Sequence, residues 1–183
     1  PRGARAGTFL HHVLEHLDFQ DMEGLEELVR TSLTRHGFEA DKWTEKVVLG
    51  IESALKTDLQ DADGAPHTLA DIPSSHRYNE LDFDLPVAGG PAIVDAAAIA
   101  RVFAEHARTE VPVEYAARLE ALRFVPLRGF LTGSIDLVYW HEGRFYVADH
   151  KSNFLGTHAA DYPHEAMSEA MQHHHYLLQS HLY

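Results

Sequence analysis

Two aspartates and a lysine late in the chain have the types and spacing of a metal-dependent hydrolytic site. Asp136 ends the segment Gly-Ser-Ile-Asp, and Asp149-His-Lys151 follows a short distance later. Carboxylate oxygens bind divalent cations, and a lysine beside such a cation can stabilise charge that develops on a phosphate. Since residues two apart on a strand share a face, Asp149 and Lys151 are expected to point to one side and His150 to the other.

The turn between these residues decides whether the aspartates meet. His141-Glu-Gly143 is a hairpin signal between two β-rich segments. If the hairpin closes through Glu142 and Gly143, Asp136 lies opposite Asp149, with Cβ atoms roughly 4.5–5.5 Å apart. Facing carboxylates destabilise a sheet unless a cation neutralises them. A loop of three residues would shift this register by one, and a surface hairpin with scattered charges is the alternative interpretation.

The hairpin must be held by elements that hydrophobic spacing and turn residues predict. Helices are expected at 8–17, 22–36, 41–59 with Asp41 as N-cap, 95–106, 115–122 and 166–183, and strands at 78–85, 132–140 and 144–151. Helices come first, then a small sheet, then a helix. This order predicts an α/β (α+β) fold.

Composition narrows the class of protein. The chain has 183 residues, which suits one domain. It has no cysteine, which excludes disulfides, thiolate metal sites and cysteine nucleophiles. The net charge of -13 argues against a free-standing DNA binder but not against a site in which carboxylates hold metal. No apolar run approaches the ~20 residues of a membrane span, so no membrane partner is expected.

Five segments share a pattern with one family of nucleases. They are PRGARAGTFLH (1–11), ELDFDLP (80–86), GFLTGSIDLV (129–138), GRFYVADHKSNFLG (143–156) and QSHLY (179–183). In this order they resemble the RecB nuclease-domain family of the PD-(D/E)xK superfamily, over nearly the whole chain. The resemblance implies a restriction-endonuclease-like core, with a small mixed sheet flanked by helices and a helical N-terminal part. It also implies that residues 1–183 are a single nuclease domain, a C-terminal piece of a larger helicase–nuclease subunit.

The resemblance implies roles for particular residues. It makes Asp136, Asp149, Lys151 and Glu80 catalytic residues, makes His11, Asp136, Asp149 and the His150 main-chain carbonyl metal ligands, and makes Gln179 and Tyr183 DNA-binding residues. The family commonly has Tyr where His150 stands, which is harmless if only the backbone coordinates. Without the resemblance, His11 and Glu80 would be ordinary helix and strand residues, and Gln179 and Tyr183 would be expected to pack on the core.

The same resemblance implies a cofactor, partners and a compartment. Mg²⁺ suits a site of few carboxylates, several waters and a phosphate, and Mn²⁺ is a plausible substitute because it tolerates a histidine ligand. The expected partners are DNA, as single strands or duplex ends, and subunits similar to RecC and RecD in the bacterial cytoplasm. The expected activity is metal-dependent hydrolysis of DNA during recombinational double-strand break repair. The chain has no phosphate-binding loop motif, so no ATPase activity is expected of it.

Two alternatives remain open at this point. One is an inactive nuclease-fold module that serves as a scaffold or contacts DNA ends, and the completeness of the site is the discriminator. The other is a zinc protease, because His12-Val-Leu-Glu15-His16 has the H-x-x-E-H spacing of an inverted zinc-binding motif. That hypothesis requires zinc at His12 and His16, with Asp136 and Lys151 uninvolved.

Overall fold

A computed structural model describes residues 2–87, 94–106, 111, 112, 114–123 and 129–182. The chain divides into two compact units, each assembled from two separate stretches. The first unit comprises Pro1–Leu81 and Ser134–Phe154, and the second comprises Asp82–Gly133 and Leu155–Tyr183. All of the predicted metal and catalytic residues belong to the first unit. No helix among the described residues has the length and apolarity needed to cross a membrane.

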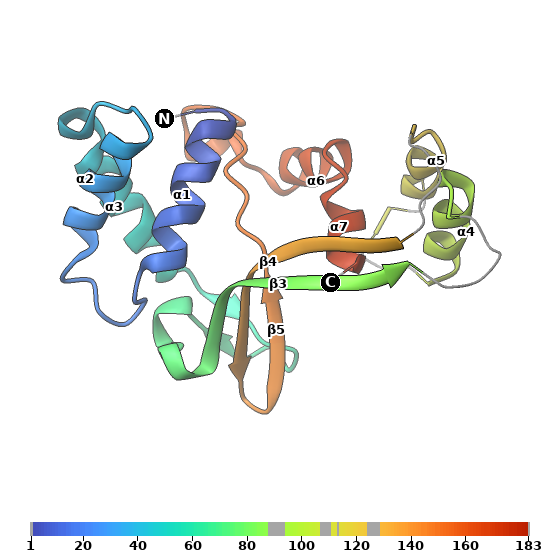
Figure 1. Ribbon diagram of the computed structural model, residues 1–183, viewed down its shortest axis with the longest axis horizontal. Coiled ribbons are helices and arrows are strands. Elements are labelled where there is room, and N and C mark those ends of the chain that lie inside the picture. The colour runs from blue at the N-terminus through green and yellow to red at the C-terminus, as the bar shows by residue number, and fades with distance from the viewer. Residues whose placement is uncertain (1, 88–93, 107–110, 113, 124–128, 183) are drawn as a thin grey trace. The chain divides into compact units, whose positions relative to one another are not determined.

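The first unit is built on helices α1 (Ala4–His16), α2 (Leu25–Arg35) and α3 (Ala40–Leu55). Helix α2 packs against both α1 and α3, and Figure 1 shows these helices in blue and teal at the N-terminal end of the colour bar. Apolar residues at helical spacing on each helix form the core. Phe9, Val13, Val29, Leu33 and Leu55 are buried there, and Leu137 and Tyr139 join them from the sheet.

The strands form antiparallel sheets, which confirms the predicted α+β class. Strands β1 (Leu59–Gln60) and β2 (Pro66–His67) make a small hairpin for which the sequence predicted no strands. Strands β3 (Arg77–Val87), β4 (Gly129–His141) and β5 (Arg144–Ala148) form the other sheet, in the order β3-β4-β5. The parallel component of a mixed sheet does not occur among these described strands.

The β4–β5 hairpin has the register that the turn residues predict. Glu142 and Gly143 have φ values of 44° and 79°, and positive φ at both central residues is the geometry of a two-residue type I′ turn. His141 therefore pairs with Arg144, and Val138 with Val147. The last pair is Leu137 with Ala148. Asp136 on β4 and Asp149 just after β5 are the next positions beyond this pair. Strand β5 ends before Lys151, although the sequence predicted a strand that includes it.

Side-chain hydrogen bonds attach the start of β3 to the end of α1. The last carbonyls of a helix have no partners within it and need donors from elsewhere. Asn79 Nδ2 donates to the carbonyls of Leu14 and Glu15, at 3.1 and 2.9 Å. The Arg77 guanidinium donates to the Leu17 carbonyl at 3.2 Å. These contacts bring the residue that follows Asn79 next to α1.

A close approach also connects α1 to the segment after β5. A Cβ atom at Gly7 would lie 3.2 Å from the Ser152 hydroxyl, so the absence of a side chain at Gly7 lets the two segments approach closely. Arg2 extends the contact, with its guanidinium 3.7 Å from the centre of the Phe154 ring. Helix α1 thus has neighbours on both chain segments that carry the predicted site.

The second unit contains α4 (Ala96–His106), α5 (Tyr115–Glu120), α6 (His164–His173) and α7 (Tyr176–Leu182). Its described core includes Ala100, Phe103, Tyr115 and Leu119. The single helix expected at 166–183 is wrong, because the chain breaks between α6 and α7 at His175, which has φ 56°. The Tyr115 hydroxyl lies 3.1 Å from His175 Nδ1 and accepts a hydrogen bond from the Leu178 amide, which supports the break.

The predicted start of the third helix is also wrong. Glu39, with φ -71° and ψ 96°, occupies the N-cap position, and Asp41 lies inside the first turn of α3. The Asp41 carboxylate accepts a hydrogen bond of 2.6 Å from Arg30 on α2. An acidic residue in the first turn favours the helix through its dipole without capping it. Helix α3 ends at Leu55 rather than Leu59.

The buried face of α2 provides a test of this core. Leu33 is 0% exposed, whereas Leu49 on α3 is 59% exposed. We expect Leu33→Ala to lower the free energy of unfolding by about 2–5 kcal/mol, because it removes buried methyl groups and leaves a cavity. The control Leu49→Ala should change it by less than about 0.5 kcal/mol. Urea denaturation followed by circular dichroism measures both, and equal losses would contradict the packing described.

Candidate metal and nuclease site

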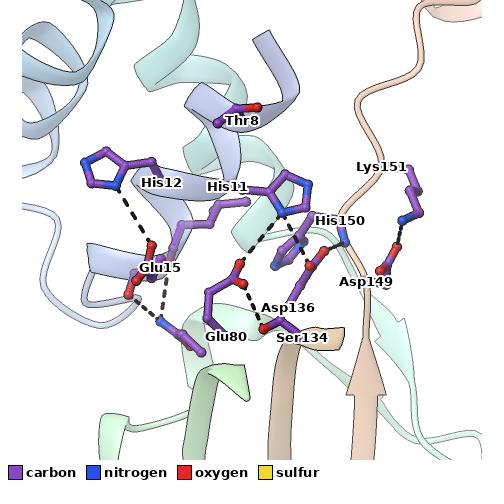
Figure 2. Close-up of polar contacts among 12 residues, drawn as sticks. Thr8, His11, His12, Glu15, Glu80, Ser134, Asp136, Asp149, His150 and Lys151 are labelled. Carbon is purple, nitrogen blue, oxygen red and sulfur yellow. Dashed lines mark hydrogen bonds and ion pairs between the residues drawn. The ribbon is translucent and has the colours of Figure 1, made fainter. Parts of the chain in front are cut away.

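Three side chains from different elements converge in the first unit. His11 comes from α1, Glu80 from β3 and Asp136 from β4 (Figure 2). His11 Nδ1 lies 3.3 Å from Asp136 Oδ1 and 3.8 Å from Glu80 Oε1. One ligand atom of each residue lies within 4.8 Å of the others. The structure thus brings together three residues that are far apart in the sequence, and an imidazole with two carboxylates is a donor set that suits a divalent cation.

Backbone strain positions Glu80. Its φ of 53° is in the left-handed region, which is uncommon for a residue other than glycine and costs of order 1–3 kcal/mol. The Glu80 carboxylate accepts a hydrogen bond of 3.0 Å from the Ser134 hydroxyl, while its other oxygen approaches His11. Strained residues of this kind cluster at functional sites. No pattern in the sequence predicts this strain, although Ser134 lies two residues before Asp136 and shares its face of β4.

Asp136 is the most enclosed of the three, with a side chain that is 10% exposed. The His150 amide donates a hydrogen bond of 2.6 Å to Asp136 Oδ2. Burial favours the protonated carboxyl, but hydrogen bonds from His11 and from the His150 amide outweigh burial and lower the pKa of Asp136. The carboxylate is therefore ionised at neutral pH and available to a cation.

The pKa of His11 shifts in the opposite direction to that of Asp136. Its hydrogen bond with Asp136 raises the pKa of His11, against the lowering effect of burial, and the negative charges of Asp136 and Glu80 add to the increase. A hydrogen bond with the His150 backbone contributes as well. When protonated, His11 is a counter-ion for the two carboxylates, and it must lose its proton before it can bind metal through nitrogen.

Asp149 and Lys151 form an ion pair with each other. Figure 2 shows this pair beside the segment that leaves β5, whereas the ring of His150 lies near His11, with ring centroids 6.4 Å apart. Burial lowers the pKa of His150, so its ring is neutral. The group of ligand atoms within 4.8 Å of one another at this site comprises His11, Glu80 and Asp136 and does not include Asp149. A role for Asp149 as a further ligand remains a prediction.

Of the two residues predicted to bind DNA, Gln179 is among the described residues and Tyr183 is not. Gln179 lies on α7 in the second unit and is half-buried. Tyr183 lies outside the described residues. Their predicted contact with DNA therefore remains an expectation that depends on the resemblance.

The residues of the rival protease motif also lie close together. His12, Glu15 and His16 have ligand atoms within 4.8 Å of one another on the surface of α1. His12 Nε2 lies 3.4 Å from the Arg35 guanidinium, and a fixed positive charge beside a ligand atom opposes a cation. His16 Nδ1 lies 2.9 Å from the His12 carbonyl. This cluster is separate from Asp136 and Lys151, and the protease interpretation is not favoured.

Comparison with known proteins identifies the class. The model of the PD-(D/E)XK nuclease superfamily matches residues 1–181, and the chain belongs to that superfamily. Within it, the chain is 35% identical over 184 residues to the RecBCD enzyme subunit RecB of Escherichia coli, and the match covers 100% of the chain. The subunits named RecB from Mycobacterium tuberculosis and Haemophilus influenzae are 39% and 32% identical, over 100% and 96% of the chain.

These relatives are much longer proteins. The matched region is 14%, 13% and 18% of the E. coli, H. influenzae and M. tuberculosis subunits, respectively. The chain is thus similar to one part of RecB, and this similarity does not establish the activities and partners of the whole relatives for it. The family itself, predicted from five sequence segments, is confirmed.

The protonation of His11 predicts how metal binding depends on pH. Since Asp136 raises the pKa of His11 above 6.5, a proton competes for the ligand nitrogen to a higher pH than at an ordinary histidine. We expect the affinity for Mn²⁺, measured by calorimetry from about pH 6 to about pH 8.5, to rise with pH and to level off above this raised pKa. His11→Gln should bind more weakly and with a flatter pH profile, whereas His76→Gln, at an exposed position, should behave as the wild type. Identical profiles for His11→Gln and the wild type would contradict a role for His11 as ligand.

Proposed function

We propose that this chain is the nuclease domain of a larger helicase–nuclease subunit and that it hydrolyses phosphodiester bonds in DNA. The observation that carries the proposal is the cluster of His11, Glu80 and Asp136 beside the Asp149–Lys151 pair, in a chain of the PD-(D/E)XK superfamily. The similarity to RecB supports a role in processing DNA ends for recombinational repair of double-strand breaks, in the bacterial cytoplasm.

The donor set fits a divalent metal ion. His11, Glu80 and Asp136 would hold it, with Asp149 and the His150 carbonyl as further candidate ligands. Oxygen ligands and a phosphate substrate favour Mg²⁺, and the imidazole makes Mn²⁺ an effective substitute. A bound ion of this kind polarises a phosphate oxygen and lowers the pKa of a coordinated water.

The protein's own groups would orient the metal ligands and stabilise the charge that develops on the phosphate. The His150 amide and His11 fix the orientation of the Asp136 carboxylate. Ser134 fixes Glu80. The Lys151 ammonium, oriented by Asp149, stabilises negative charge that develops on the phosphate during attack by water. These contacts hold the groups in place before substrate binds, which reduces the reorganisation needed in the transition state.

We infer a set of partners that follows from the relatives' names. DNA, as single strands or duplex ends, is the substrate, and subunits similar to RecC and RecD deliver it, since the relatives are subunits of an enzyme named RecBCD. Gln179 and Tyr183 are proposed to contact the DNA. An inactive scaffold is the other interpretation of such a fold, but His11, Asp136, Asp149 and Lys151 are all present, and completeness of the site favours an enzyme.

Removal of one carboxylate tests the metal site. Asp136→Asn keeps the shape of the side chain but removes the charge that binds the cation and pairs with His11. We expect cleavage of single-stranded DNA in Mg²⁺ to fall at least about a hundredfold, with an unchanged circular dichroism spectrum. Asp58→Asn, at an exposed position, should retain wild-type activity. A fully active Asp136→Asn protein would remove the basis for the proposed function.

Removal of the lysine separates catalysis from binding. We expect Lys151→Ala to lower kcat by roughly two to three orders of magnitude, because the charge it stabilises develops only in the transition state. The Kd for DNA, measured in Ca²⁺ to suppress cleavage, should change by less than about threefold, since one phosphate contact contributes little to affinity. The control Lys46→Ala, on the exposed surface of α3, should alter neither quantity. A large loss of affinity with normal kcat would make Lys151 a phosphate anchor instead.

A further inference from the structure

A cavity of about 320 Å³ lies beside the candidate site within the first unit. Helices α1 and α3 supply its apolar walls through Leu10, Leu14, Val47 and Ile51. His11, His150 and Lys151 line it as well. The cavity and the candidate site therefore share three residues, and a phosphate bound at the site would lie directly beside an apolar recess.

A glycine in the middle of α3 keeps this recess open. Gly50 lines the cavity and lies well inside the helix Ala40–Leu55, where glycine is less favourable than almost any other residue. Close packing does not require glycine there, because a Cβ atom at Gly50 would meet no neighbouring atom within 4 Å. Its φ is not among the positive values, so backbone conformation does not require it either. Any larger side chain at this position would reduce the space in the cavity.

DNA offers one group that fits such a recess. The sugar and phosphate are polar, and the base is the flat part of each nucleotide, with apolar faces and polar edges. Proteins that bind single strands take up bases on apolar and aromatic surfaces while a positive charge holds the backbone. Lys151 provides a positive charge at the edge of this cavity. A base in a duplex is stacked and paired, and it could enter only after it had been unstacked at a free-energy cost.

We propose that the cavity between α1 and α3 is a subsite that binds the unpaired base of the nucleotide next to the phosphate being cleaved. The proposal rests on the proposed nuclease function and extends it. The subsite selects single-stranded DNA, because only an unpaired base can fill it without first leaving a helix. It also positions the phosphate, since a base held in the cavity limits where the adjoining backbone can lie.

The first test fills the cavity from α3. Gly50→Leu places a branched side chain in the recess, and we expect kcat/KM for a short single-stranded oligonucleotide to fall about tenfold. The matched control is Ser53→Leu, which adds the same side chain at an exposed position of α3 outside the cavity and should keep wild-type kcat/KM. Gly50→Leu should melt no lower than the wild type, because leucine favours the helix more than glycine does.

The outcomes distinguish a failure of the proposed nuclease function from a failure of the base subsite. If the wild-type chain does not cleave DNA in Mg²⁺ or Mn²⁺, the proposed function fails. If the wild type cleaves and Gly50→Leu cleaves equally well, the base subsite is wrong while the nuclease remains. A fall in kcat/KM for Gly50→Leu alone, with no loss of thermal stability, supports the subsite.

The second test changes the DNA and leaves the wild-type protein intact, so it does not depend on how any variant folds. A single abasic position is moved along the oligonucleotide, and the cleavage products are mapped. We expect wild-type cleavage to drop severalfold at the phosphate next to the missing base and to remain normal elsewhere. Uniform cleavage regardless of the abasic position would overturn the proposal.

Discussion

The contact between His11 and Asp136 is the interaction on which the arrangement of the site depends. A carboxylate that is 10% exposed cannot stay ionised without donors around it, and His11 and the His150 amide supply them. Glu80 adds a second negative charge, and like charges this close oppose each other's ionisation. The raised pKa of His11 favours a positive charge among the carboxylates, and a metal ion bound through the same nitrogen must replace that proton. The donors that hold the Asp136 carboxylate in place are thus the ones that prepare it for a cation.

Helix α1 connects this chemistry to the core. Phe9 and Val13 are 0% exposed and fix the helix on α2, so the rotation of the helix that directs His11 toward β4 is set by packing rather than by loop conformation. Its final carbonyls receive the donors of Arg77 and Asn79, which brings Glu80 next to it. A site supported by packed elements is held more precisely than one built on loops alone. The same helix forms one wall of the cavity, so core, site and cavity share one rigid element.

The parts that could be predicted from sequence are those governed by local chemistry. Glu142-Gly143 predicted a two-residue turn, and the register that follows from such a turn is observed. The helix break at His175 could not be predicted, because its cause is tertiary: Tyr115, 60 residues away in sequence, interacts with the broken segment. Asp41 was expected to cap α3, but it forms an ion pair with Arg30 on a neighbouring helix. The strained φ of Glu80 depends on contacts with Ser134 and His11, and periodicity contains no information about either.

The two stretches of the first unit are synthesised at different times, because more than fifty residues of the other unit lie between them. Its first stretch ends at Leu81, and its second, Ser134–Phe154, is separated from it by a segment that belongs to the other unit. Domains fold as units while the chain is being synthesised, N-terminal parts first. A ribosome that has completed the first stretch, up to Leu81, has made His11 and Glu80, but it has not yet made Asp136, Asp149 or Lys151. The full set of candidate site residues therefore exists only after translation has passed the β4–β5 hairpin.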